Sequence, residues 1–284
     1  MKILTLGPKG SFSEIASKNF LRNFNEEGQI SFCSSISEVF ENVFKNLEKE
    51  LFGVIPVENM IDGSVGESLD LLYKYSSIEV ISEVIIPINL CLASKSSLKD
   101  VSKVISHPKA IGQCREYVLK KGFRTESELS TSSAMKRVSE NNSNEGLAAI
   151  GTREAAEYYG LNVLDENIED NKNNVTRFFV ISSNKNLFQE KNKKQDDKKS
   201  YKTSLAIHPT SDEPGLLLKI LEPFSKKGVN LTKIESRPTK VNLGEYIFYI
   251  DFDRDIGDRE VKEALNEVKK FGEVRIFGSY FKGR

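Results

Sequence analysis

The stretch ILTLGPKGSFSEIASKNFLRNF, residues 3–24, contains a short apolar run, a loop rich in glycine and serine, and an amphipathic segment, in that order. Ser11 and Glu14 stand in the S-x-x-E spacing of a capping box, so we expect a helix that begins after Ser11 and continues to about Phe24. A strand that leads through a tight loop into a helix is the repeating unit of α/β folds. The stretch therefore predicts an α/β architecture.

The same succession recurs four more times before residue 184. Residues 52–57 lead into a segment in which Ser64 and Glu67 repeat the capping-box spacing, and residues 101–105 lead into a helix expected over residues 109–122. Fainter starts occur at residues 130–133 and 151–152. Five such units favour a mostly parallel sheet covered by helices.

Two extended segments, residues 78–93 and 175–182, are longer or more apolar than connectors need to be. We interpret them as crossover strands between two lobes, with the ligand in the cleft between the lobes. We expect lobe 1 to comprise about residues 1–78 and 172–183 and lobe 2 about residues 79–171. Residues around 173–178 would then lie beside the ligand.

Residues 184–200, NKNLFQEKNKKQDDKKS, have the composition of a linker because six lysines and three acids accompany only two residues that a core would bury. They divide the chain into residues 1–183 and 201–284. In the second part the pattern predicts strand 201–208, helix 215–227, strands 230–238 and 245–252, helix 258–271 and strand 273–280. This βαββαβ order is the ferredoxin-like motif, and so small a domain with open sheet edges commonly pairs with a second copy.

Composition excludes several classes of function. Lys plus Arg and Asp plus Glu are 41 each, so no net charge favours nucleic acid, and the 29% of charged residues argues against a membrane span. The three cysteines are scattered and the two histidines lie far apart, so we expect no metal site. An odd number of unpaired cysteines, together with the absence of a signal peptide, indicates a cytoplasmic location. Walker, G-x-G-x-x-G and G-x-S-x-G motifs are absent from the sequence.

Neutral hydrogen-bonding side chains are placed instead at the expected strand-to-helix turns. They are Ser11, Asn59, Ser64, Ser106, Gln113 and Thr176, with Arg177 beside the last. Together with helix N-termini, which carry partial positive charge, such groups suit a small polar anion. A simpler interpretation makes Ser106 a helix N-cap, Gln113 a solvated residue and Arg177 a salt-bridging residue on the strand face opposite Thr176.

Four segments in order resemble the prephenate dehydratase family. They are GPKGSFSEIA, VIPVENMIDGSVGESLDLL, SHPKAIGQC and NIEDNKNNVTRFFVI. Residues 201–284 are similar to ACT regulatory domains, with Pro214-Gly215-Leu216-Leu217 at the Gly-Ala-Leu-type turn and Glu235-Ser236-Arg237-Pro238 as the ESRP motif. Met60 stands where the family often has a small polar residue.

The resemblance implies a two-lobed catalytic domain like a type II periplasmic binding protein, followed by the ACT domain. It implies conversion of prephenate to phenylpyruvate, with loss of water and carbon dioxide and with no cofactor or metal, as a step of phenylalanine biosynthesis. Thr176, Arg177 and Phe178 would be catalytic, with Thr176 at the leaving hydroxyl. Substrate-binding residues would be Ser11, Asn59, Ser64, Ser106 and Gln113, whereas His107 would be structural.

In the ACT-like domain, the resemblance implies feedback inhibition by L-phenylalanine in a homodimer or homotetramer. Its site would comprise Gly215, Leu216, Asn230, Leu231, Glu235 and Ser236, across a dimer interface. Three alternatives remain open. They are arogenate dehydratase, which acts on the amino-acid form of the substrate, a noncatalytic two-lobed protein that binds an amino acid or another anion, and a purely regulatory amino-acid sensor built on the ACT-like domain.

Overall fold

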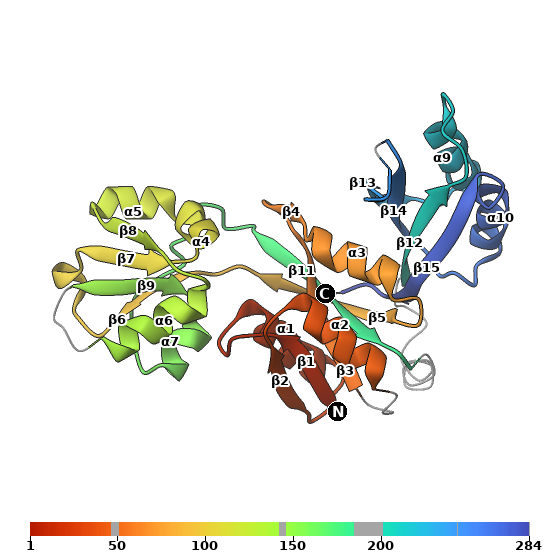
Figure 1. Cartoon of the computed structure of the whole chain (residues 1–284). Coiled ribbons are helices and arrows are strands. Elements are labelled where there is room, and N and C mark those ends of the chain that lie inside the picture. The colour runs from red at the N-terminus through yellow and green to blue at the C-terminus, as the bar shows by residue number, and fades with distance from the viewer. Residues whose placement is uncertain (47–50, 142–145, 185–200, 243, 284) are drawn as a thin grey trace. The chain divides into compact units, whose positions relative to one another are not determined.

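The computed structural model describes residues 1–46, 51–141, 146–184, 201–242 and 244–283 (Figure 1). The chain forms two compact units, residues 1–39, 53–66 and 84–178 in the first, and residues 40–52, 67–83 and 179–284 in the second. All of the expected linker 184–200 except Asn184 lies outside the described residues. No helix in the described ranges has the length and apolar character that crossing a membrane requires.

The first sheet has the strand order β2-β1-β3-β11-β5, with β4 paired to β3. Its strands are β1 (Lys2–Leu6), β2 (Gln29–Cys33), β3 (Leu51–Asn59), β4 (Gly63–Ser64), β5 (Glu79–Pro87) and β11 (Val175–Ser182). Its helices are α1 (Phe12–Asn23), α2 (Ile36–Lys45) and α3 (Gly66–Lys74). As predicted, Ser11 caps α1, because its side chain accepts the Glu14 N–H at 3.4 Å.

The predicted capping box of Ser64 and Glu67 is wrong. Gly63 has φ of +78°, a conformation that glycine adopts without a steric penalty, and it turns the chain back so that Ser64 pairs with Glu58 in a short hairpin. Ser64 is therefore a strand residue, and α3 begins two residues later at Gly66.

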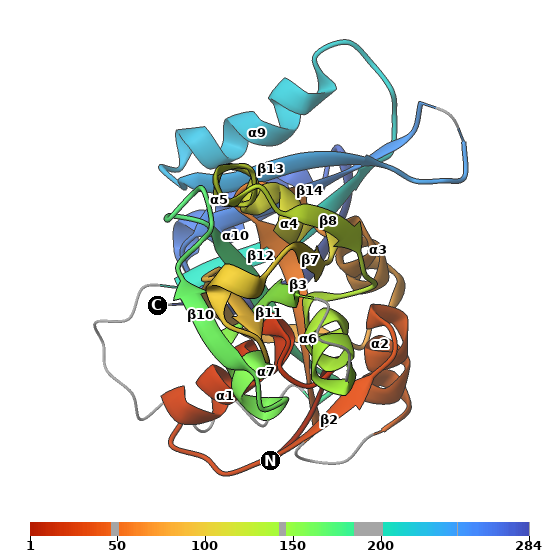
Figure 2. The same ribbon diagram turned by 90° about the vertical axis from the view of Figure 1, so that its left-hand side faces the viewer.

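The second sheet, in the first compact unit, has the order β10-β6-β9-β7-β8. Its strands are β6 (Cys91–Ser94), β7 (Lys103–Ser106), β8 (Arg124–Ser127), β9 (Leu147–Gly151) and β10 (Asn162–Glu166). The short 3₁₀ helix η1 (Leu98–Asp100) precedes β7, and the α-helices are α4 (Pro108–Gln113), α5 (Arg115–Lys121), α6 (Thr131–Glu140) and α7 (Arg153–Tyr158). Figures 1 and 2 show α4 and α5 on one face and α6 and α7 on the other. Separate apolar clusters fill the two interfaces.

This sheet is less parallel than the sequence predicts. β7 pairs in parallel with β8 and β9, but β6 runs antiparallel to both β9 and β10. β6 follows β5 with no helix between them, whereas parallel neighbours in a sheet need such a crossover helix. β6 therefore runs opposite to β9.

The helix predicted over residues 109–122 is interrupted at Cys114, which has φ −118° and ψ +26°. The segment around Asp170 enters this break. The Asp170 N–H donates to the Gln113 carbonyl at 2.7 Å, and the Asp170 carboxylate accepts the Glu116 N–H at 3.2 Å. These bonds replace helical ones, so the chain forms α4 and α5 instead of one helix.

Both predicted crossovers are present. β5 belongs to the first sheet and β6 to the second, so the chain changes sheet between Pro87 and Cys91 rather than at residue 79. β11 returns to the first sheet. At this point the Ile88 N–H donates to the Asn174 carbonyl at 2.9 Å, which joins the two crossover segments.

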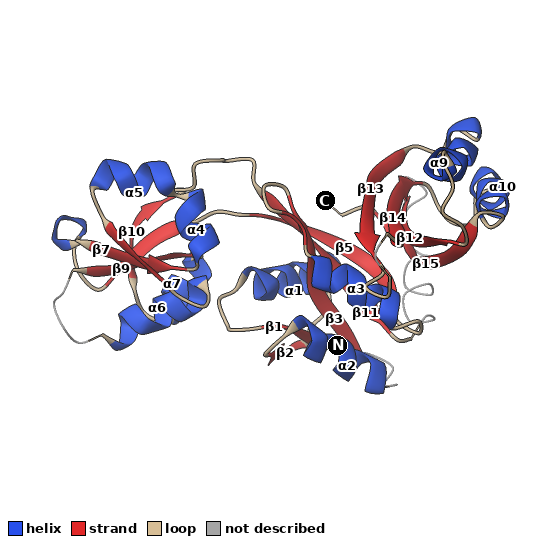
Figure 3. Ribbon diagram, turned by 45° about the horizontal axis from the view of Figure 1, so that its top comes forward, coloured by secondary structure: helices blue, strands red, loops and turns tan. Residues whose placement is uncertain are grey.

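The four-stranded sheet, in the second compact unit, has the order β13-β14-β12-β15 and confirms the predicted βαββαβ fold. Its elements are β12 (Tyr201–Pro209), α9 (Leu216–Lys226), β13 (Leu231–Pro238), β14 (Tyr246–Asp253), α10 (Arg259–Val268) and β15 (Gly272–Phe281). Figures 1 and 3 show α9 and α10 on the same face of the sheet. The core between the helices and the sheet includes Ile220, Phe224, Val261 and Val268, which are all 0% exposed.

Candidate active site

A cavity of about 280 Å³ lies within the first compact unit, where the loop after β1, the end of β3, the starts of α4 and α6, and the start of β11 meet. Loops at strand ends and helix starts are where α/β proteins bind ligands. The lining residues are Leu6, Gly7, Pro8, Ser11, Phe12, Ser13, Pro56, Asn59, Asp62, Ile88, Leu90, His107, Lys109, Ala110, Gln113, Leu129, Ser130, Thr131, Ser132, Thr176 and Phe178.

The loop that carries Ser11 is fixed by the starts of α6 and α7. Gly10 has φ of +82°, and a Cβ there would lie 2.6 Å from the Cβ of Ala155, so only glycine fits. Its carbonyl accepts the Thr152 hydroxyl at 2.6 Å, and the Lys9 carbonyl accepts the Ser132 hydroxyl. Ser11 is therefore positioned from the second sheet as well as by its own helix.

Asn59 is at the centre of the polar network in the cavity. Its Oδ1 accepts the backbone N–H groups of Ile61 and Asp62 at 3.0 and 2.9 Å, which fixes the orientation of the amide. Its Nδ2 then faces β11 and donates to Thr176 Oγ1 and Asn174 Oδ1, both at 2.9 Å, and more weakly to the Val175 carbonyl at 3.2 Å.

Thr176 is thereby given a defined hydrogen-bonding direction. Its side-chain oxygen accepts from Asn59, and a hydroxyl that accepts one hydrogen bond still has a proton to donate. Thr176 is 8% exposed and lines the cavity, so an acceptor atom on a bound ligand can receive this proton.

Asn174 lies behind Asn59 and Thr176. It is 2% exposed, and within the part of the chain that the structure describes its Nδ2 has no hydrogen-bond partner. A buried hydrogen-bond donor without a partner costs stability, so Asn174 needs a compensating interaction. The structure shows one, because its Oδ1 accepts from Asn59 Nδ2.

The two helix starts in the cavity wall suit an anion. The N-terminus of α6 is here, capped by Ser130 in a capping box with Ser133, and the N-terminus of α1 follows Ser11. The unpaired N–H groups and partial positive charge of both helix starts favour a carboxylate nearby. Phe178, 2% exposed, contributes an apolar surface next to Thr176.

Three of the predicted site residues are not part of the described cavity wall. Arg177 is on the other face of β11, where Nη1 lies 3.7 Å from Oε2 of Glu58. Ser64 is in the β3–β4 hairpin. Ser106 is fully buried and donates to the Ile150 carbonyl at 2.7 Å, and His107, not Ser106, caps α4.

Ser11, Asn59, Gln113, Thr176 and Phe178 are brought together by the fold. Sequence reasoning missed further polar residues of the cavity wall, namely Asp62, Lys109, Ser130, Thr131 and Ser132. For the serines a signal existed, because the helix start at residues 130–133 was recognised as one of the five junctions. No pattern distinguished Asp62 or Lys109 from ordinary surface charges.

Other reactive groups do not converge on this cavity. The three cysteines are buried, and desolvation raises the pKa of the Cys91 thiol to about 12, so it stays protonated at neutral pH. Across the described residues no three His, Cys, Asp or Glu side chains lie together as a metal site requires.

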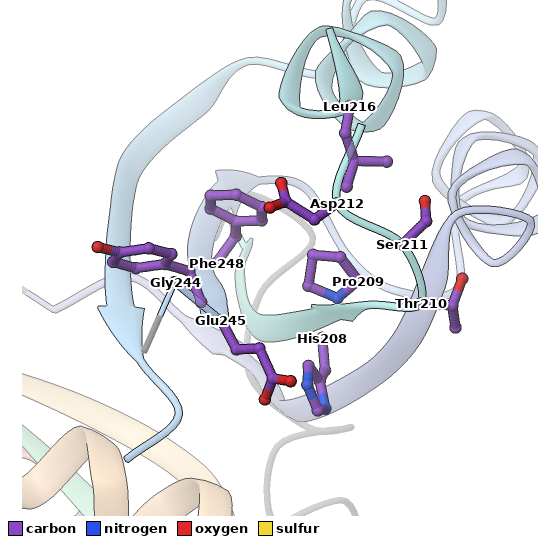
Figure 4. A pocket seen from close by; sticks show the side chains of 10 residues that line it. His208, Pro209, Thr210, Ser211, Asp212, Leu216, Gly244, Glu245 and Phe248 are labelled. Atoms are coloured by element: carbon purple, nitrogen blue, oxygen red, sulfur yellow. The ribbon is translucent and has the colours of Figure 1, made fainter. Parts of the chain in front are cut away.

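A second cavity, of about 490 Å³, lies at one end of the four-stranded sheet in the second compact unit. It is formed by the end of β12, the loop that leads to α9, and the start of β14. Figure 4 shows Leu216, at the start of α9, extending toward the loop that carries Pro209 and Asp212.

Of the predicted effector residues, Leu216 lines this second cavity. Gly215 is the N-cap of α9 with φ of +82°, and a Cβ there would meet no atom within 4 Å, so the helix start faces open space. Asn230 precedes β13, and Leu231, Glu235 and Ser236 are in it. Within the described chain these four are not part of the cavity wall.

Comparisons with known proteins match both parts of the chain. The family model described as prephenate dehydratase matches residues 3–186, and the model described as ACT domain matches residues 210–270. A prephenate dehydratase of Methanocaldococcus jannaschii is 42% identical over 280 residues, which cover 96% of this chain and 95% of that protein.

Two further relatives extend the comparison. Arogenate dehydratase/prephenate dehydratase 2 of Arabidopsis thaliana is 30% identical over 295 residues, covering 99% of this chain and 72% of that protein. The crystal structure of prephenate dehydratase in complex with L-Phe from Arthrobacter aurescens has a TM-score of 0.86 and 30% identity, covering 100% of this chain and 90% of the other.

Proposed function

The chain belongs to the prephenate dehydratase family, and on this premise we propose that it converts prephenate to phenylpyruvate in the cavity around Thr176. The observation that carries the proposal is the bond from Asn59 Nδ2 to Thr176 Oγ1, which leaves the threonine proton to be donated. This is the hydrogen bond that a departing hydroxyl needs.

The reaction requires two bonds to break together. The electron pair of the bond to the ring carboxylate moves into the ring as carbon dioxide leaves, and the carbon–oxygen bond to the 4-hydroxyl breaks, so that hydroxide leaves with a proton as water. Thr176 donates its hydrogen bond to that hydroxyl, and a hydrogen-bonded chain restores the proton. A threonine hydroxyl is a weak acid, so orientation and fixed dipoles contribute most of the rate.

The remaining wall residues have complementary roles. Phe178 places an apolar surface beside the departing carboxylate, and poor solvation of that group favours its loss as neutral carbon dioxide. The starts of α1 and α6, with Ser11 and Ser130, hold the carboxylate that remains. Gln113 supplies a further amide. Arg177, Ser64 and Ser106 lie outside the cavity wall and would support the site only through the strands that carry them.

The test compares Thr176→Ala with the control Thr125→Ala, which changes an exposed threonine on β8, by measuring phenylpyruvate formation from prephenate. We expect Thr176→Ala to lower kcat/KM by at least about 100-fold and the control to leave it unchanged. A folded Thr176→Ala protein with the wild-type rate would overturn the assignment of Thr176. Parallel reactions with arogenate measure which form of the substrate is preferred.

We also propose that L-phenylalanine inhibits the enzyme by binding at the second cavity. The ACT-like fold, the open space at Gly215 and the L-Phe complex of the Arthrobacter aurescens relative support this. Isothermal titration should show binding, and Leu216→Ala should weaken it while Leu218→Ala, which changes an exposed leucine of the same helix, should not. Absence of phenylalanine binding to the wild type would remove the proposal.

A homodimer or homotetramer is part of the same proposal. β13 is at the edge of its sheet, with Ile234 47% exposed, and an edge strand is a surface on which a second copy commonly pairs. Asn230, Leu231, Glu235 and Ser236 belong to this edge or precede it, and would reach the effector across the interface. Sedimentation equilibrium with and without L-phenylalanine measures the assembly, and a monomer in both states would contradict it.

A further inference from the structure

The catalytic cavity contains little charge for a substrate with two carboxylates. Among the described residues that line it, the acidic and basic side chains are those of Asp62 and Lys109, with His107 beside them. They form an ion pair, with Lys109 Nζ 3.4 Å from Asp62 Oδ2. The one lysine that faces the substrate is therefore already paired with a carboxylate of the protein.

Both members of this pair are anchored through their backbones to residues of the site. The Asp62 N–H donates to Oδ1 of Asn59, the residue that holds Thr176. The Lys109 N–H donates to Nδ1 of His107 at 3.2 Å in the first turn of α4. The side chains remain movable, because those of Lys109 and Asp62 are 63% and 30% exposed.

An exposed lysine–carboxylate pair contributes little to stability, so Lys109 can exchange the Asp62 carboxylate for another one at little cost. A substrate carboxylate offers Lys109 the same interaction with additional contacts to the helix starts around it. We propose that Lys109 binds a carboxylate of prephenate, and that Asp62 is the competing counter-charge that sets how far prephenate is preferred over arogenate. The inference rests on the proposed function and specifies its substrate recognition.

The preference follows from the charges of the two substrates. Arogenate carries an ammonium group where prephenate carries a neutral ketone. Lys109 repels that ammonium group and Asp62 attracts it. Removal of Lys109 should therefore weaken prephenate binding and leave Asp62 unpaired for arogenate, whereas removal of the Asp62 charge should have the opposite effect.

The experiment measures kcat and KM for both substrates with Lys109→Gln, Asp62→Asn and the control Lys120→Gln, which removes an exposed lysine of α5. We expect Lys109→Gln to raise the KM for prephenate about 10-fold with kcat changed less than about twofold, and to raise the KM for arogenate less. We expect Asp62→Asn to lower the KM for prephenate about threefold and to raise that for arogenate.

Salt provides a second readout that a purely structural role would not change. Raising the ionic strength should increase the prephenate KM of the wild type and of Lys120→Gln, but have less effect on Lys109→Gln. An active wild type whose KM is unchanged in Lys109→Gln would overturn this inference alone. A wild type inactive on both substrates would overturn the proposed function and this inference together.

Discussion

At the scale of single residues, we expect Asn174 to affect catalysis although it is not part of the described cavity wall. Its Oδ1 accepts one of the two protons of the Asn59 amide, which directs the other to Thr176. Asn174→Ala should therefore lower kcat about 10-fold and change KM less, and should cost about 1–2 kcal/mol of stability because a buried amide loses its partner.

Steady-state kinetics and urea unfolding measure these two effects separately. The control is Asn173→Ala, which changes the exposed neighbouring residue. A stable Asn174→Ala protein with wild-type kcat would show that Asn59 keeps its orientation without this bond.

The family motifs predicted only part of the cavity wall. Asn59, Thr176 and Phe178 line the cavity, whereas Ser64, Ser106 and Arg177 of the same motifs do not. Asp62 and Lys109 were not predictable, because they meet only when the β3–β4 hairpin and the first turn of α4 come together. The spacing of residues along the sequence does not predict that Lys109 and Asp62 form an ion pair.

At the scale of elements, the loop between β1 and α1 depends on close approach at Gly10. Both Gly10→Ala and Gly160→Ala impose a side chain on a left-handed residue, with φ of +82° and +66°, but only at Gly10 does the new Cβ meet another residue. We expect Gly160→Ala to cost about 1 kcal/mol and Gly10→Ala about 2–4 kcal/mol, because Ala155 must also move.

Urea unfolding gives both free energies. Gly10→Ala should also reduce prephenate turnover, since Ser11 is displaced with the loop. Equal losses of stability at the two positions would show that the contact with Ala155 relaxes without cost.

Helix α3 contacts the four-stranded sheet through Asp70 within the second compact unit. Burial by itself raises the pKa of Asp70, but hydrogen bonds from Arg237 and Lys240 and their charges hold it below the ordinary value of 3.8. The stabilisation is therefore present above about pH 4 and is lost as the pH falls through the lower folded-state pKa.

Asp70→Asn should lower the free energy of unfolding at pH 7 by about 1 kcal/mol, a modest value because the carboxylate is partly exposed. The difference from the wild type should shrink as the pH falls from 4 toward 2. Urea unfolding across this range measures it, with Glu222→Gln, which removes an exposed pair on α9, as the control. A difference that does not change with pH would exclude the ion pair as its cause.

Element order was predictable to a large extent, since the βαββαβ order and the two crossovers are as expected. The differences arise where distant segments supply the hydrogen bonds. Asp170 interrupts the helix at Cys114, and the turn at Gly63 takes Ser64 into a hairpin. The local spacing of residues does not predict such hydrogen bonds.

At the scale of the whole molecule, we expect α3 to be the segment through which an effector acts on the site. It begins at Gly66, shortly after Asp62 of the cavity wall, and its final turn is held by β15. Arg275 donates to the carbonyl oxygens of Tyr73 and Tyr75, the latter at 2.6 Å, where the helix leaves its carbonyls unpaired.

We therefore expect an effector that moves β15 to act also on α3, whose final turn Arg275 holds. Arg275→Ala should keep prephenate turnover within about twofold of the wild type, but raise the L-phenylalanine concentration for half inhibition about 10-fold, because the two sites lose part of their coupling. Initial rates across a phenylalanine titration measure this, with Arg259→Ala, an exposed arginine of α10, as the control. If isothermal titration shows unchanged phenylalanine binding while inhibition weakens, the loss lies in the coupling. Unchanged inhibition in Arg275→Ala would mean that the effector acts through a different segment.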